Sequence, residues 1–343
     1  MKLILLTNTG KCGTLFIQRL FDGHPHIITF PFAFNYYYAW NKLLTNKDDL
    51  NSFMNKLLEF TSLKEVLRYV DKDKYIKRVR DHLPNDFKIE KDRKELLEAL
   101  HLAYNFLVSL NRKATHILLN TINVNSLDQI QADYPTHKHI FLIRDPKNSF
   151  AAYLSSDHTH NPVYKFQFLR NTLHNAIYTQ SYFNKHPDQV NFLKIEDLNE
   201  DLTVAMKFLC KWLNINFADI LLRETINSRT YNTPTTKLIE RKISSKIRNT
   251  RWMHSLTPTE VVLIEFLHKE LIKDHYQFSS NKIFRNKLMA IFLLFMPDFH
   301  YHNQETSETY TLGNIFKPKQ WFINGLNWFR LIRAIESKER LQL

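Results

Sequence analysis

The chain has 343 residues, of which 44% are hydrophobic and 13% aromatic, a composition that supports a substantial core and excludes disorder over most of its length. Its formal net charge of +13 favours anionic partners such as a phosphorylated nucleotide, an acidic glycan, an anionic membrane or nucleic acid, without choosing among them. The two cysteines, Cys12 and Cys210, give neither a disulfide framework nor metal-site spacing, which favours a cytoplasmic protein.

The N-terminal segment predicts a strand, a turn and a helix. The apolar run at residues 3–6 is too short for a secretory signal and leads directly into TNTGKCGT at residues 7–14. Beyond that turn, apolar residues recur at helical spacing as far as Phe21. A second strand is expected at residues 26–30, HIITF, because this run is rich in β-branched residues.

The middle of the chain alternates between helical and strand patterns. Residues 34–113 carry mainly helical patterns and are predicted to form a helical insertion. Short buried-type strands return at residues 116–120, 139–143 and 190–195, and each is followed by a helical pattern. Such alternation predicts an α/β fold with a central parallel sheet of about five strands flanked by helices.

The C-terminal third is more polar. Residues 225–252 show little periodicity, which predicts a mobile loop and a candidate lid, and a capped helix is expected at residues 258–272. The predicted division is an α/β domain at residues 1–280 and a helical appendix at residues 281–343, packed on the domain or on a partner. The longest apolar run, residues 288–296, is too short to span a bilayer.

A basic, tryptophan-containing helix is predicted at residues 317–338. It is a candidate for peripheral membrane contact, and the alternative is a helix that packs on the domain or on a second subunit. Nucleic acid is not an expected partner, because the chain contains no RNA-binding aromatic motif and no zinc-ligand spacing. The apolar residues that fall near one face of this helix are Trp321, Phe322, Leu326, Phe329 and Ile332.

The turn TGKCGT has the groups that a phosphate-bearing ligand needs. Gly10 and Gly13 permit a tight turn, Lys11 supplies a cation, Thr14 supplies a hydroxyl, and the following helix directs its free amides at the ligand. The pattern G-x-x-x-x-G-K-[ST] is absent because Lys11 precedes the second glycine, which disfavours an ordinary nucleoside triphosphatase. The alternative is a plain strand-to-helix turn with a surface lysine.

This segment, together with FDGHPHI after it, resembles the 5′-phosphosulfate loop of the sulfotransferases. Cys12 stands where that pattern has serine, and Leu15 stands where it has a second hydroxyl. The resemblance implies a loop that binds the donor 3′-phosphoadenosine 5′-phosphosulfate (PAPS). The residues that match the pattern are Lys11, Gly13, Thr14, His24 and Pro25. The residues that the resemblance assigns to the donor are Gly10, Lys11, Cys12, Gly13, Thr14 and Leu15.

A second segment, HIFLIRDPKNSFAAYLSS at residues 139–156, resembles the 3′-phosphate motif of the same family. Arg144 follows the predicted strand, and the planar guanidinium group suits a dianionic phosphate. The family's second contact, a serine eight residues after the arginine, is Ala152 here. Ser149 is therefore assigned to the donor, with Ser155 and Ser156 as alternatives for the missing hydroxyl.

Two further segments resemble the family. In residues 190–215, Glu196 and Asp197 match a strand-plus-helix signature, and we expect them to cap the helix that begins near Leu202. Residues 244–258, SSKIRNTRWMHSLTP, resemble the basic loop that closes over the nucleotide. The resemblance there assigns Lys246, Arg248 and Trp252 to the donor, and a solvated basic loop is the alternative. In all, the resemblance covers roughly residues 1–30, 115–215 and 240–275.

The resemblance implies transfer of a sulfuryl group from PAPS, without a metal, to a hydroxyl or amine of an acceptor that the sequence does not identify. Lys11 would stabilise the developing charge, and His116, His158 and His160 are candidates for accepting the proton. Glycan, lipid headgroup and aromatic small molecule all remain open as acceptors. A non-catalytic protein that binds a nucleotide or polyanion, and a basic membrane adaptor, are the alternative functions.

Overall fold

The computed structural model describes residues 1–45, 48–108, 113–122, 124–155, 162–230, 252–256, 260, 261, 264, 265 and 268. The chain forms two compact units. One contains Met1–Arg144 and His174–Arg248, and the other contains Asp145–Leu173 and Asn249–Leu343. The predicted division at residue 280, the predicted membrane-contact helix and most of the predicted helix at 258–272 lie outside the described residues.

The first unit contains the predicted parallel sheet, with five strands in the order β2-β3-β1-β4-β5. In the middle of the sheet, Leu6 of β1 pairs with Asn120 of β3 on one side and with Ile140 of β4 on the other. The carboxyl ends of these strands therefore meet at one edge of the sheet. The strands are β1 (Lys2–Asn8), β2 (Ile27–Thr29), β3 (His116–Asn120), β4 (Lys138–Ile143) and β5 (Val190–Lys194).

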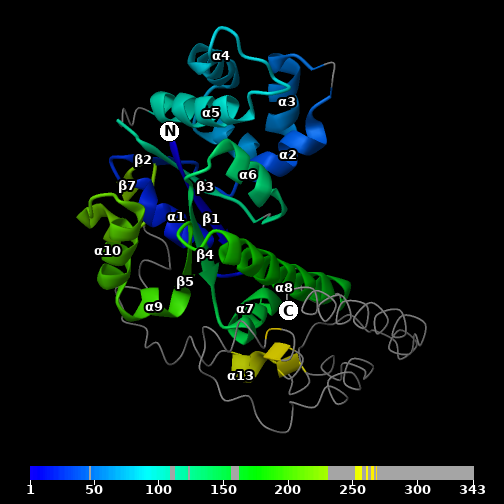
Figure 1. Cartoon of the computed structure of the whole chain (residues 1–343), viewed down its shortest axis with the longest axis vertical. Coiled ribbons are helices and arrows are strands. Elements are labelled where there is room, and N and C mark those ends of the chain that lie inside the picture. The colour runs from blue at the N-terminus through cyan, green and yellow to red at the C-terminus, as the bar shows by residue number, and fades with distance from the viewer. Residues whose placement is uncertain are drawn as a thin grey trace, which may run out of the picture. The chain divides into compact units, whose positions relative to one another are not determined.

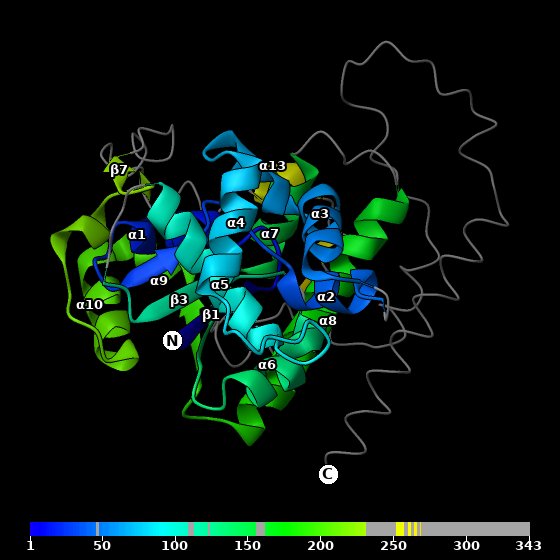
Figure 2. The same cartoon turned by 90° about the horizontal axis from the view of Figure 1, so that it is seen from above.

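Helices surround the sheet and follow its strands. The cluster α2 to α5, which is the predicted insertion, lies away from α9 and α10 in Figure 1, and Figure 2 shows the same elements from above. The helices of the first unit are α1 (Thr14–Asp22), α2 (Tyr36–Leu43), α3 (Leu50–Phe60), η1 (Ser62–Arg68), α4 (Lys72–His82), α5 (Arg93–Leu107), η2 (Val124–Ser126), α6 (Leu127–Asp133), α9 (Ile195–Glu200), α10 (Leu202–Leu213) and η3 (Asp219–Leu222), and α8 (Pro162–Lys185) is shared with the second unit.

The helix α1 is held against the sheet by a continuous apolar core. Its residues Ile17, Leu20 and Phe21 are fully buried against strand residues such as Ile4 and against helix α10. Burial of each such side chain contributes about 1.5–3 kcal/mol to folding. Because α1 begins directly after the turn TGKCGT, this packing sets the position of that turn relative to the strand ends.

Two short segments differ from the sequence prediction. Residues 225–230, predicted as loop, form an antiparallel hairpin of β6 (Thr225–Ile226) and β7 (Arg229–Thr230). Asn227 and Ser228 have φ values of 52° and 58°, which suits the two-residue turn that matches strand twist. The rest of the candidate lid lies outside the described residues.

The second difference concerns the cap of α10. The Asp201 side chain, and not Glu196 or Asp197, accepts the Val204 amide at 2.9 Å. Glu196 and Asp197 lie instead in the first turn of α9, where negative charge favours the helix dipole.

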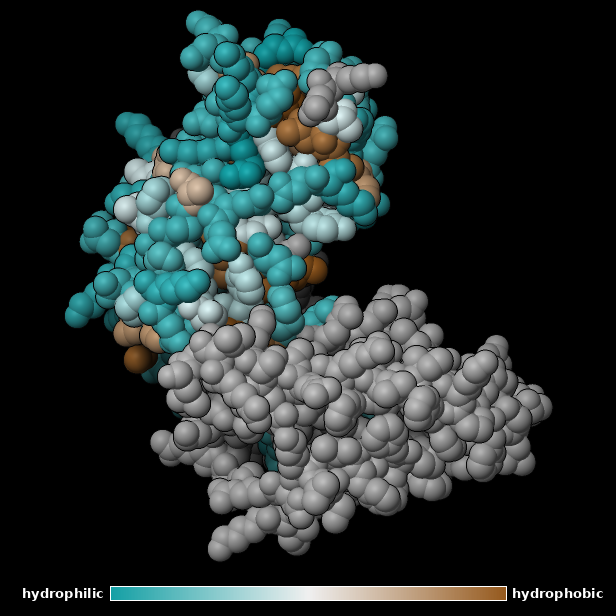
Figure 3. Space-filling model, turned by 45° about the vertical axis from the view of Figure 1, so that its right-hand side comes forward, coloured by the Kyte–Doolittle hydropathy of each residue, from teal (hydrophilic) through white to brown (hydrophobic). Residues whose placement is uncertain are grey.

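The described surface is mainly hydrophilic on the face drawn in Figure 3, with small apolar groups between the polar side chains. Among the described residues, no helix is both long and apolar enough to cross a membrane. The large apolar side chains that are exposed include Leu15, Ile122, Val204 and Phe208.

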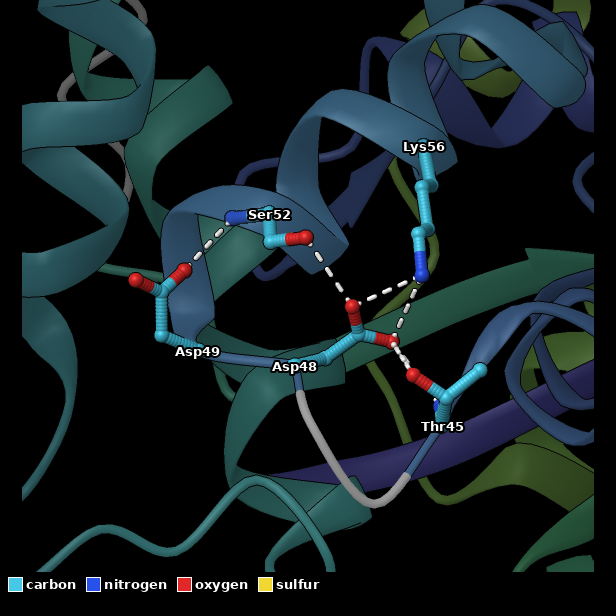
Figure 4. Close-up of polar contacts among 5 residues, drawn as sticks. All are labelled: Thr45, Asp48, Asp49, Ser52 and Lys56. Atoms are coloured by element: carbon cyan, nitrogen blue, oxygen red, sulfur yellow. Dashed lines mark hydrogen bonds and ion pairs between the residues drawn. The ribbon is translucent and has the colours of Figure 1, made fainter.

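The start of α3 is anchored by one carboxylate, shown in Figure 4. Asp48 accepts hydrogen bonds from the Thr45 amide and hydroxyl at 2.8 and 3.0 Å and from the Ser52 hydroxyl at 2.9 Å. Lys56 Nζ lies 2.7 and 2.9 Å from its two oxygens. The bonds from Lys56, with those from the neighbouring donors, hold the pKa of Asp48 well below its usual range.

Candidate functional site

The loop after β1 has an unusual backbone. Gly10, Lys11 and Gly13 have φ values of 120°, 46° and 79°, so three of four consecutive residues lie in the region that disfavours side chains. Lys11 adopts this conformation at a cost of roughly 1–2 kcal/mol, because its Cβ crowds the following carbonyl. Backbone of this kind turns successive amides toward one concave side, which is a recurrent way to bind an anion.

The side chain of Cys12 stabilises the loop from inside. Its buried thiol donates to the Gly10 carbonyl at 2.9 Å, and its sulfur lies 3.1 Å from the Thr9 hydroxyl. Burial raises the pKa of the Cys12 thiol to about 11, so the thiol is protonated at neutral pH. Cys12 therefore presents only its backbone to a ligand.

The loop ends at the beginning of α1. Gly13 is the N-cap, and its carbonyl accepts the amides of Phe16 and Ile17 at 3.0 and 3.2 Å. The amides of Thr14 and Leu15 have no acceptor among the described residues. Free amides at a helix N-terminus carry partial positive charge and favour an anion at this point.

Arg144 joins the loop from the neighbouring strand. It follows the last residue of β4, and its Nη1 donates to the Lys11 carbonyl at 3.1 Å. The two motifs, which are 133 residues apart in the sequence, thus meet at the carboxyl edge of the sheet. The Arg144 guanidinium has five N–H donors, so this bond leaves it able to bind a phosphate as well.

Glu196 also lies close to this loop. Its negative charge raises the pKa of Cys12 further, in addition to the larger effect of burial, while the positive charge of Arg144 lowers it. From the sequence, Glu196 was predicted only to cap a helix, because the proximity of α9 to the loop depends on the pairing of β4 with β5.

These groups suit a phosphate or sulfate ester. The exposed Lys11 amine and the Arg144 guanidinium supply positive charge, and the loop and helix supply directed amides. Such charge-assisted hydrogen bonds are about twice as strong as neutral ones. The described residues include no group of three or more histidine, cysteine, aspartate or glutamate side chains that could hold a metal ion.

His116 lies away from this site. It begins β3 and pairs with Lys2, whereas the loop follows Asn8 at the other end of β1. The separation along the strand is about 20 Å at about 3.3 Å per residue. Burial and the nearby charge of Lys2 lower the pKa of His116 to about 4. His116 is therefore too far from the loop for the predicted role in proton transfer.

Other predicted residues are not placed by the structure. His158, His160, Lys246, Arg248 and Ser156 lie outside the described residues, and their roles stay predictions.

The second unit contains the remaining predicted residues. Ser149 is buried in α7 (Pro146–Leu154), whose first turn is capped by Asp145 through the Lys147 amide at 2.9 Å. Lys147 is 3% exposed, lies 3.0 Å from a Glu265 carboxylate oxygen and sits 5.1 Å from the Trp252 ring centre in α13 (Trp252–Ser255). The burial of Lys147 was not predicted from the sequence, in which the run Arg-Asp-Pro-Lys at residues 144–147 was its only signal.

His24 has a structural role. Its ring is buried, with Nε2 2.8 Å from the Asn216 carbonyl and Nδ1 3.2 Å from the His26 amide. The amide must donate, so Nδ1 accepts and Nε2–H donates to Asn216. This residue ties the end of α1 to the segment after α10.

Comparison with known proteins identifies the family. The family model described as "Sulfotransferase family" matches residues 4–219, which is more than half of the chain. The chain belongs to the sulfotransferase family. The match begins in β1 and ends in η3, so it includes the loop, Arg144 and the whole sheet. No curated protein gives a significant match.

Solved structures share the sulfotransferase fold at low sequence identity. The sulfotransferase domain of the Synechococcus PCC 7002 olefin synthase is 12% identical, with a TM-score of 0.50 over 82% of this chain and 96% of that one. The sulfotransferase domain from the curacin biosynthetic pathway is 15% identical, with a TM-score of 0.45 over 79% and 97%. Mouse sulfotransferase SULT7A1, complexed with PAP, is 12% identical, with a TM-score of 0.41 over 85% and 87%.

Proposed function

We propose that this sulfotransferase binds PAPS on the loop from Gly10 to Leu15 and on Arg144, and transfers its sulfuryl group to an acceptor hydroxyl or amine. The observation that carries this proposal is the hydrogen bond from Arg144 to the Lys11 carbonyl. This bond holds Arg144 next to the loop with its concave amides and next to Lys11, at the carboxyl edge of the sheet. Two such cationic groups suit a ligand that carries phosphate at both its 5′ and 3′ positions.

Each of these groups has a distinct task in the proposal. The amides of residues 12–15 and the Lys11 amine bind the 5′-phosphosulfate, and the Arg144 guanidinium binds the 3′-phosphate. PAPS supplies the sulfuryl group when it is bound. The Lys11 amine and the loop amides would donate hydrogen bonds to the negative charge that develops as the bond to sulfur breaks. Because these donors are already oriented, they stabilise the charge without reorganisation.

The experiment that tests turnover follows ³⁵S from labelled PAPS into a mixed panel of phenols, alkyl alcohols, amines and sugars. We expect transfer by the wild-type protein and a loss of about two to three orders of magnitude in the Lys11→Ala variant. Lys64→Ala is the matched control, because Lys64 is an exposed lysine of η1. Binding of PAPS with no transfer to any acceptor would instead support a non-catalytic nucleotide-binding protein.

A further inference from the structure

Helix α10 presents a rigid outward surface on the first unit (Figure 1). One face of the helix is buried in the core beside α1 and is formed by Met206, Leu209, Cys210 and Leu213. The opposite face carries two large apolar side chains one turn apart, Val204 and Phe208, which are 63% and 54% exposed. Because the buried face fixes the helix, this exposed pair is held in a defined position.

Phe208 differs from the exposed phenylalanines of the helical insertion. Lys42 Nζ lies 4.6 Å from the ring centre of Phe60, and the Arg78 guanidinium lies 3.6 Å from the ring centre of Phe106. Each of those rings is therefore partly covered by a cation of its own chain. Within the described part of the chain, no cation or aromatic ring covers Phe208. An exposed apolar pair that includes such a ring marks a contact surface for another molecule.

Charges of opposite sign lie at the two ends of this face. Asp201 is the N-cap of α10 and Lys211 lies in its last turn, and both are exposed. With 3.6 residues per turn, they fall on the same face of the helix as Val204 and Phe208. Asp201 Oδ1 accepts the Val204 amide, which leaves its other oxygen able to accept from a cation. Neither charge forms an ion pair with another described residue.

The exposed face of α10 is complementary to itself when a second copy lies antiparallel to it. Asp201 and Lys211 lie at equal separations along the helix from position 206, and so do Val204 and Phe208. A two-fold axis through that position therefore places Asp201 opposite Lys211 of the second copy. The same axis places Val204 opposite Phe208 of the second copy. Each contact then occurs twice, so the interface closes as a dimer, and the two helix dipoles oppose each other favourably.

We propose that the chain forms a symmetric homodimer through antiparallel α10 helices. A second copy fits this face better than an anionic membrane does, because Asp201 would be repelled by the lipid headgroups, whereas it pairs with a lysine in the dimer. A further lysine, Lys207, lies over the Phe217 ring at 5.5 Å and is held within its own subunit. One helix from each copy makes a small interface, so we expect a weak dimer with a Kd on the order of 10–100 µM. This inference is independent of the proposed sulfuryl transfer.

Sedimentation velocity of the full chain tests the apolar centre of this interface. We expect the wild-type protein to pass from monomer to dimer between about 5 and about 500 µM. Phe208→Glu should raise the Kd at least about tenfold, because it buries a carboxylate without a partner in the dimer. Phe106→Glu is the matched control, since Phe106 is a phenylalanine of α5 that is 48% exposed and lies outside the interface. Its Kd should equal that of the wild type.

A charge substitution tests the antiparallel register. Lys211→Asp places a carboxylate opposite Asp201 of the second copy and should raise the Kd about threefold to tenfold. Adding Asp201→Asn removes this repulsion and keeps a side chain that can cap α10, so the double variant should recover most of the loss. In a parallel dimer Lys211 would face its own copy, and Lys211→Asp would exchange one like-charged pair for another. An unchanged Kd in Lys211→Asp would therefore overturn the antiparallel arrangement.

Three other results would overturn the dimer. The first is a wild-type protein that stays monomeric at the highest concentration. The second is an equal loss of association in Phe208→Glu and Phe106→Glu, with circular dichroism showing that both variants are folded. The third is a monomer that sediments with phosphatidylserine vesicles and loses this binding in Phe208→Glu, which would assign the exposed face of α10 to a membrane surface.

Discussion

Substitution of Gly13 by alanine isolates the contribution of the loop's backbone. Gly13 has a φ of +79° and is the N-cap of α1. A Cβ atom there would lie 3.4 Å from Ile195 Cδ1 and 3.9 Å from Ile195 Cγ1, which is ordinary contact. The side chain therefore has room, and the cost comes from the left-handed backbone, about 1–2 kcal/mol.

Stability and binding should respond to this change by different amounts. A loss of about 1–2 kcal/mol lowers the midpoint of thermal unfolding by about 2–8 °C for a domain of this size. If the backbone relaxes, the Gly13 and Thr14 amides turn away from the anion. Loss of one hydrogen bond to a charged group costs about 1.5–3 kcal/mol, which weakens binding of adenosine 3′,5′-bisphosphate by about tenfold to a hundredfold.

The control is Gly23→Ala, at the other end of the same helix. Gly23 has a φ of −78°, which any residue adopts, but a Cβ atom would lie 2.4 Å from Ile220 Cγ1. Overpacking of this kind costs about 1–3 kcal/mol. We expect Gly23→Ala to lower the unfolding midpoint and leave calorimetric affinity within about twofold. Wild-type affinity in Gly13→Ala, or an equal loss of affinity in both variants, would refute the assignment of binding to the Gly13 backbone.

Two further predictions concern side chains that stabilise the fold. Cys12→Ser should keep donor affinity within about threefold, because a hydroxyl can make the same two bonds, whereas Cys12→Ala should lose more affinity. Because the pKa of the native Cys12 thiol is about 11, this thiol should resist iodoacetamide at pH 7.5. Rapid alkylation seen by mass spectrometry would contradict the burial of the thiol. Asp48→Asn should lower the free energy of unfolding by about 1–3 kcal/mol at pH 7. Because Lys56 lowers the pKa of Asp48 in the folded state, the carboxylate contributes stability above its unfolded pKa, about 3.9, and loses it as the pH falls through the folded pKa. The difference between Asp48→Asn and wild type in urea unfolding should therefore shrink below about pH 4, and a constant difference between pH 7 and pH 3 would contradict the Asp48 contacts.

The sheet was predictable because strands of a buried parallel sheet have sequences that are short apolar runs. The run HILLN predicted β3 with both of its ends correct, and the other four strands were predicted to within two residues. The position of α1 after the turn was also clear, since the glycines and the apolar spacing from Leu15 to Phe21 agree. These signals are local, and burial on both faces of the sheet makes them strong.

What could not be predicted depends on contacts between distant segments. The bond from Arg144 to Lys11 requires β4 to lie beside β1, and the hydrogen bond from the Asn120 side chain to Gln18 requires β3 on the other side. The hairpin at Asn227 was missed because the two-residue signal Asn-Ser is weaker than Asn-Gly. The cap of α10 was assigned to Glu196 and Asp197 instead of Asp201, because the sequence locates a helix boundary only to within a few residues.

Calorimetric titration with adenosine 3′,5′-bisphosphate tests the central claim most directly, in wild type and in Lys11→Ala and Arg144→Ala, with 5′-AMP as a second ligand. We predict binding by wild type, weaker binding in both variants, and a preference for the bisphosphate over 5′-AMP that Arg144→Ala removes. Absence of bisphosphate binding to the wild-type protein, or an undiminished preference in Arg144→Ala, would contradict the donor site proposed for the loop and Arg144.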